Sequence, residues 1–120
     1  MQLAEQAARD LARAQQTVVA VTGEVDFVTD GTREVRVTGG SPLMPQVTAT
    51  GCALTAVVGA FVAVSKQDTY TAAVAALSCF GIAGRRAGAL ADGPGSFAWR
   101  FLDALAALET DSLTRESPLR

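Results

Sequence analysis

The sequence has 120 residues, a formal net charge of -2, two cysteines and no histidine, which fits one small domain or a piece of a larger one. Without histidine the common zinc geometries and every histidine-based catalytic dyad are excluded, and two cysteines alone cannot complete a structural metal site. The charge predicts no basic surface of the kind that binds nucleic acid, so no nucleic-acid partner is expected.

The two cysteines, Cys52 and Cys79, both fall in apolar stretches that are typical of helices, which favours reduced thiols and a cytoplasmic location. The chain opens on a helical pattern rather than on a secretory signal. The apolar stretch 52–64 is shorter than the roughly 18 residues that a membrane span requires. We therefore expect no membrane partner.

The first part of the chain predicts a helix, a strand and a hairpin. Apolar residues recur at helical spacing over residues 1–16, which indicates an amphipathic surface helix. The β-branched run 17–23 favours a strand covered on both faces, as in a parallel sheet. Two alternating segments flank Asp30-Gly31, which predicts a β-hairpin within residues 24–40.

The second part predicts a loop and three helices. Residues 39–51 hold glycines and two prolines in a long loop of a kind that is often functional. The stretch 52–65 is apolar all round and 71–90 is almost as apolar, so both helices are expected to be buried or to pack closely on another element. Ser96 is the expected N-cap of a last helix, and residues 110–120 resemble a frayed, disordered polar tail. The apolar face of that last helix consists of Phe97, Phe101, Leu105 and Leu108.

These elements give an α/β fold with too few strands for its helices. A buried parallel strand needs neighbours on both edges. We therefore expect the rest of the sheet to come from elsewhere in the chain, from another polypeptide or from a subunit.

The stretch TATGC (residues 48–52) places a glycine turn directly before a helix. Backbone N–H groups at such a helix N-terminus favour an anion, for example a transferring phosphate. Ala49, Thr50, Gly51 and Cys52 occupy the positions of that nest. The same field favours the thiolate of Cys52, which would allow it to accept a proton from an attacking hydroxyl.

A second interpretation of this stretch is purely structural. Thr48 or Thr50 would cap the helix, and Cys52 would be a small buried apolar residue. Cys79 lies mid-helix with no activating neighbour, so we expect it in the core. Asp30 and the other acidic residues of the hairpin are expected on its polar face, and no metal ligand is assigned.

Four ordered blocks, VVAVTGEVDFVTDG, PLMPQVTATGCALTAVVGAF, AVAALSCFGIAG and GPGSFAWRFLDAL, resemble the C-terminal half of the hydroxyethylthiazole kinases. The resemblance covers nearly the whole chain. Related ribokinase-like enzymes usually carry aspartate at the position of Cys52. The resemblance implies a ribokinase-like, three-layer αβα fold, of which residues 1–109 would form the C-terminal portion of a single kinase domain.

The resemblance also implies a reaction: ATP and Mg²⁺ would phosphorylate the hydroxyl of 4-methyl-5-(2-hydroxyethyl)thiazole in thiamine biosynthesis or salvage. Thr22 would contact ATP, Cys52 would act as the catalytic residue beside the transferred phosphate, and Ala49 would contact the substrate. The family commonly has glycine where this sequence has Ala49. The family assembles as a trimer, so a homo-oligomer is expected, and the N-terminal half that completes the enzyme would be needed for activity.

Two other functions stay open at this point. In the first, the chain would be a non-catalytic fragment or interaction module that keeps the packing surfaces of the fold. Alternatively it would belong to another ribokinase-like small-molecule kinase, such as a hydroxymethylpyrimidine phosphate kinase, which predicts aspartate rather than Cys52.

Overall fold

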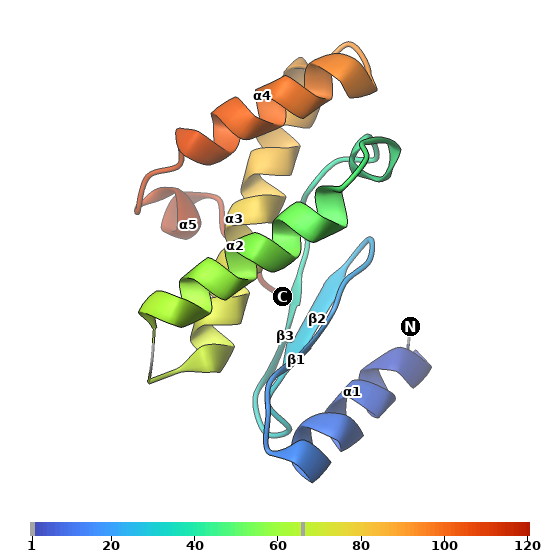
Figure 1. Cartoon of the computed structure of the whole chain (residues 1–120), viewed down its shortest axis with the longest axis vertical. Coiled ribbons are helices and arrows are strands. Elements are labelled where there is room, and N and C mark those ends of the chain that lie inside the picture. Colours follow the sequence, from blue (N-terminus) through green and yellow to red (C-terminus); the bar gives the residue numbers. More distant parts are fainter. Residues whose placement is uncertain (1, 66) are drawn as a thin grey trace.

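Helices and strands follow one another along the chain in nearly the order that the sequence predicts (Figure 1). The computed structural model describes residues 2–65 and 67–120. Its elements are α1 (Gln2–Gln15), β1 (Val19–Val21), β2 (Asp26–Thr29), β3 (Glu34–Val37), the 3-10 helix η1 (Met44–Gln46), α2 (Thr50–Val64), α3 (Thr69–Leu90), α4 (Pro94–Ala106) and α5 (Ser112–Arg115). None of the described helices combines the length and hydropathy needed to cross a membrane.

The three strands form an antiparallel sheet of order β1-β2-β3. The hairpin predicted around Asp30-Gly31 is confirmed, since β2 and β3 pair with Asp26 opposite Val37. The Asp30 carboxylate closes the turn by accepting the backbone N–H of Arg33 at 2.6 Å.

The expectation of a parallel, fully covered strand at 17–23 is wrong for β1. This strand runs antiparallel to β2, with Val21 opposite Phe27, and Ala20 is exposed. The connection 22–25 explains the difference, because a parallel pairing requires a crossover of about a dozen residues or more. Within the described residues β1 is an edge strand.

Helices cover both faces of β2. Phe27 and Val28 point to opposite faces and both are 0% exposed. On one face Arg9 of α1 lies over the Phe27 ring at 5.2 Å, whereas on the other Val28 packs with Leu77 of α3. Figure 1 accordingly shows α1 on one side of the strands and α2 and α3 on the other. The α/β class is therefore confirmed.

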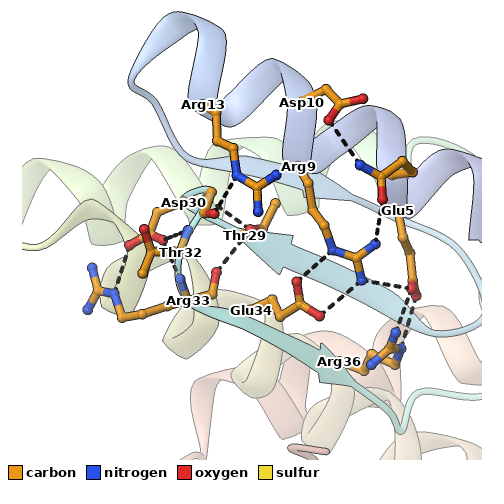
Figure 2. A network of polar contacts seen from close by, with 12 residues as sticks. Glu5, Arg9, Asp10, Arg13, Thr29, Asp30, Thr32, Arg33, Glu34 and Arg36 are labelled. Atoms are coloured by element: carbon orange, nitrogen blue, oxygen red, sulfur yellow. Dashed lines mark hydrogen bonds and ion pairs between the residues drawn. The ribbon is translucent and has the colours of Figure 1, made fainter.

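Ion pairs fix α1 to the sheet (Figure 2). Glu5 is only 4% exposed, and its carboxylate accepts two hydrogen bonds from Arg36 of β3 at 2.9 and 2.5 Å. Arg9 donates to Glu34 of β3 at 2.7 and 3.0 Å. A buried carboxylate needs such partners, because leaving it unpaired would be costly.

A second ion pair joins the hairpin to the start of α3. Arg33 donates to both oxygens of Asp68 at 3.1 Å and stacks on the Tyr70 ring at 4.3 Å. Asp68 also caps α3 by accepting the N–H of Thr71 at 3.2 Å. The Arg33 guanidinium, and then Thr71, hold the pKa of Asp68 well below its usual range.

A second apolar cluster lies between α3 and α4. The rings of Phe80 and Phe101 meet edge to face at 4.8 Å, and Phe97 stacks on Phe101 at 5.7 Å. The predicted apolar face of the last helix is therefore confirmed. Its predicted N-cap is not, because Gly93 takes that position before Pro94, which suits the first helical residue. Ser96 instead accepts the N–H groups of residues 92 and 93.

Of the two arrangements expected for α2, burial is not found, and the helix packs on α3 instead. No residue of α2 is buried, and Val64 is 85% exposed. Leu54, Val57 and Val58 are partly buried and pack against apolar side chains of α3. An all-apolar helix has more apolar surface than one neighbouring helix can cover. Much of α2 is therefore exposed apolar surface in this chain.

The end of the chain is attached to the sheet, which differs from the frayed tail expected for residues 110–120. Leu119 forms an antiparallel bridge with Val37, and Glu116 pairs with Arg86 of α3. The terminal backbone thus occupies the second side of β3, where an unpaired strand edge would otherwise be left.

Three glycines of α3 allow the loop after β3 to lie directly against the helix. The N–H of Gly40 donates to the carbonyl of Gly81 at 2.8 Å. A Cβ added at Gly84 would lie 2.9 Å from the Cα of Gly40, and one at Gly88 would lie 2.6 Å from the Ser41 hydroxyl. The loop can therefore take this position only because these three residues are glycines and carry no Cβ.

We expect Gly84→Ala to destabilise the fold and Gly59→Ala to stabilise it. Alanine is the better helix former by about 1 kcal/mol, and a Cβ at Gly59 would contact nothing within 4 Å. At Gly84 the new Cβ would lie 2.8 Å from the Met44 sulfur, and overpacking of this kind costs about 1–3 kcal/mol. Urea unfolding of both variants measures the difference; equal stabilisation of the two would contradict the close packing.

A further prediction concerns acid. A carboxylate with a lowered pKa stabilises the folded state above its ordinary pKa of about 3.9, and that stability is lost as the pH falls through the folded value. Asp68→Asn keeps a capping side chain but loses the charge that pairs with Arg33. Its thermal unfolding midpoint should lie below the wild-type midpoint at pH 7, and the gap should close towards pH 2.

Asp103→Asn is the control for this experiment, because Asp103 is exposed on α4 and forms no ion pair within the described ranges. Its midpoint should follow the wild type at every pH. A gap for Asp68→Asn that stays constant from pH 7 to pH 2 would exclude the ionic origin of the stabilisation.

Candidate functional site

A pocket of about 830 Å³ lies where the β1–β2 connection, the loop after β3 and the start of α2 come together. Figure 1 shows α2 beginning at the end of the molecule where β1 turns into β2. The polar side chains that line the pocket are Thr22, Glu24, Asp26, Thr38, Ser41 and Thr50. Its apolar side chains include Val37, Met44, Leu54 and Phe80.

The β1–β2 connection forms one wall of this pocket. Thr22 follows the last residue of β1 and is exposed at the pocket. Asp26 begins β2, and its Oδ1 accepts the N–H of Gly23 at 3.0 Å. Burial raises the pKa of the Asp26 carboxyl, and the hydrogen bond from Gly23 opposes this shift.

The N-terminus of α2 forms the wall of the pocket that faces the β1–β2 connection. The first backbone hydrogen bond of the helix runs from Ala53 N–H to Ala49 O at 3.0 Å. Within the described part of the chain, the N–H groups of Thr50, Gly51 and Cys52 donate to no protein acceptor. A side chain at Gly51 would meet nothing within 4 Å, so the space before these groups is open. Such a terminus accepts an anion.

The helix has no side-chain cap, which excludes the capping role considered for Thr48 or Thr50. Ala49 is the N-cap residue, and the Thr50 hydroxyl points back and donates to the Val47 carbonyl at 2.9 Å. Ala49 adopts a left-handed conformation with φ 68° and ψ 15°. Alanine is strained in this region, whereas glycine is not.

Cys52 is exposed in the first turn of α2, which argues against a buried apolar role. Neither Cys52 nor Ala49 lines the pocket, whereas Thr22, Thr50 and Gly51 do. The structure therefore brings together three of the five residues that the sequence singles out. Cys79 is partly buried, and burial raises the pKa of its thiol.

The pocket also contains Asp26, which the sequence did not single out, and the Gly39–Gly40 turn, which lies in the loop predicted for residues 39–51. Both glycines have positive φ, at 109° and 76°. The adjacent glycines were a detectable turn signal. The role of Asp26 was hidden, because a carboxylate at the start of a hairpin strand resembles an ordinary surface residue.

Among the described residues, no group of three acidic, cysteine or histidine side chains is arranged to hold a metal ion. Glu24 and Asp26 line the pocket, but Asp26 is engaged with Gly23. No lysine or arginine occurs among the described lining residues. Backbone N–H groups are therefore the groups in this part of the site that can bind an anion, by donating hydrogen bonds to it. The side chains described here do not form a magnesium site by themselves.

The fold and this pocket define an α/β protein with an anion-accepting helix N-terminus. The family model described as the hydroxyethylthiazole kinase family matches residues 1–111. The chain belongs to this family, which confirms the resemblance seen in the four sequence blocks.

Individual relatives agree with this family. The hydroxyethylthiazole kinase of Rhizobium etli (strain CIAT 652) is 64% identical over 110 residues, which cover 92% of this chain and 43% of that protein. That of Rhizobium rhizogenes is 58% identical over 117 residues, 98% of this chain and 44% of that protein. The solved structure of hydroxyethylthiazole kinase protein from Pyrococcus horikoshii OT3 has a TM-score of 0.90 at 39% identity, covering 99% of this chain and 46% of that chain. The chain thus spans less than half the length of these relatives.

We expect Ala49→Gly to stabilise the fold by about 1 kcal/mol, because glycine relieves the left-handed conformation. Ala60→Gly, in the exposed interior of α2, is the matched control and should destabilise by about 1 kcal/mol. Chemical denaturation measures both. If Ala49→Gly destabilises as much as the control, the left-handed conformation of Ala49 is incorrect.

Proposed function

We propose that this chain supplies the nucleotide-binding side of a hydroxyethylthiazole kinase, which transfers the γ-phosphoryl group of ATP to the hydroxyl of 4-methyl-5-(2-hydroxyethyl)thiazole. The observation that carries the proposal is the shared pocket of Thr22 and the open N-terminus of α2. The names of the relatives support the substrate. The product would enter thiamine biosynthesis or salvage.

Phosphoryl transfer depends on positioning and charge stabilisation. The N–H groups of Gly51 and Cys52 would donate to the oxygens of the transferring phosphoryl group, supported by the positive end of α2. Thr22 would contact the nucleotide from the opposite wall. Ala49 would contact the thiazole through the loop that precedes the helix.

The sulfur of Cys52 would orient the substrate hydroxyl and, as the thiolate, accept its proton to become the thiol, because this side chain lies beside the same helix N-terminus and is exposed. Cys52 does not line the pocket in which the nucleotide would bind. This fits a contact with the alcohol, which would approach the phosphoryl group from the side opposite the nucleotide.

The remaining features of the proposal follow the family resemblance. The fold would be ribokinase-like, residues 1–109 would belong to one kinase domain, and the enzyme would work as a cytoplasmic trimer. Mg²⁺ would enter with ATP and neutralise its phosphate charge. The side chains that the structure describes do not form a site for it by themselves.

The test measures ATP binding by calorimetry and formation of thiazole phosphate, using the chain alone and the chain mixed with the remaining N-terminal part of the Rhizobium etli relative. We expect Thr22→Ala to weaken ATP binding. We expect Cys52→Ala to lower kcat in the active preparation by about 10²-fold or more, the usual effect of a proton-transfer residue, without a matching change in ATP affinity.

Cys52→Asp is the informative companion, because related kinases of this fold carry aspartate there. Retained turnover in Cys52→Asp would show that a proton acceptor, rather than the thiol itself, is required. Absence of ATP binding and of turnover in both preparations, together with self-association of the chain, would contradict the kinase and favour an interaction module that uses the exposed apolar surface of α2.

A further inference from the structure

Asp26 ties together the two ends of the β1–β2 connection. The connection 22–25 joins Val21 to Asp26, and Val21 lies opposite Phe27 in the register of the two strands. The side chain of Asp26 reaches back across it, and its Oδ1 accepts the N–H of Gly23 at 3.0 Å. The connection is therefore closed by a side chain as well as by the strand pairing.

The anchor of this contact is rigid. Asp26 pairs with Val37 in the β2–β3 ladder, and the next two residues, Phe27 and Val28, are 0% exposed. Gly23, at the other end of the contact, has the widest backbone freedom of any residue type. A fixed acceptor thus restrains a flexible donor.

Thr22 is next to this restraint along the chain. It precedes Gly23 directly, it is exposed at the pocket, and its hydroxyl has no partner among the residues that the structure describes. No side-chain hydrogen bond therefore fixes the Thr22 hydroxyl, whereas the residue that follows it is bonded to Asp26.

The charge of Asp26 is unexpected beside a site for a polyanion. Like charges repel, so a carboxylate in this pocket weakens the binding of phosphates by direct electrostatics. Burial also takes favourable solvation from the ionised carboxylate, and this raises its pKa. A function that depends on its oxygen as an acceptor explains its presence.

We propose that Asp26 is a positioning residue, which accepts the Gly23 N–H and thereby fixes Thr22 for contact with the nucleotide. This inference rests on the proposed function of the pocket. If Asp26 positions Thr22, removal of its side chain weakens ATP binding. If only charge repulsion matters, removal of the carboxylate strengthens ATP binding.

The experiment compares Asp26→Ala with Asp26→Asn in the full chain. Both remove the charge, and only asparagine keeps an acceptor oxygen. We expect Asp26→Ala to weaken the binding of Mg-ATP by about tenfold, the loss of one hydrogen bond to a charged acceptor. Asp26→Asn should restore the affinity to the wild-type range or improve it, and Asp103→Ala on α4 should not change it.

Amide hydrogen exchange at Gly23, measured by NMR, gives a second readout that does not require ATP. Protection should be lost in Asp26→Ala and kept in Asp26→Asn. Tight binding by Asp26→Ala, or binding by Asp26→Asn as weak as by Asp26→Ala, would overturn the proposal.

The same data separate this inference from the proposed function. If the wild-type chain binds no Mg-ATP, and Gly23 protection still follows the variants as expected, the nucleotide site is wrong and the control of the turn by Asp26 is correct. Unchanged Gly23 protection in Asp26→Ala would show that Asp26 does not hold the turn.

Discussion

The close contact between α3 and the loop after β3 is the constraint on which the candidate site depends. The Gly81 carbonyl accepts the N–H of Gly40 at 2.8 Å, and this approach is possible only because α3 presents glycines there. The loop runs on through η1 to Ala49 and the first turn of α2. The place of the open helix N-terminus is thus set by backbone packing on α3.

The facing wall is set in a different way. Antiparallel pairing with β2 brings the end of β1 to the same end of the molecule as α2, and Asp26 restrains the short connection that carries Thr22. Ion pairs of Glu5 and Arg9 hold α1 against the other face of the strands (Figure 2). Two supports therefore meet at one pocket, whose lining combines hydroxyl side chains, two carboxylates and apolar side chains with the open N–H groups of α2.

Much of the secondary structure follows from local sequence signals. Asp30-Gly31 between alternating segments specifies the hairpin, and the spacing of Phe97 and Phe101 specifies the buried face of α4. The direction of β1 does not follow, because a β-branched run looks alike in parallel and antiparallel strands. The exposure of α2 does not follow either, because apolar composition reports what a helix can bury and not which neighbours it has.

The site was partly predictable for similar reasons. A glycine before an apolar helix indicates an anion-accepting terminus, and Thr22, Thr50 and Gly51 do meet at the pocket. The left-handed conformation of Ala49 could not be predicted from the residue itself, because alanine disfavours that conformation. Asp26 could not be predicted because its partner is a backbone N–H, which the sequence does not display.

The most direct measurement of the central claim is an NMR titration of the chain with ATP that follows its backbone amides. If the β1–β2 connection and the start of α2 form one phosphate site, the amides of Thr22, Gly23, Gly51 and Cys52 shift together with a single affinity. Shifts confined to other surfaces, or no shifts at these four amides at saturating ATP, would contradict the account.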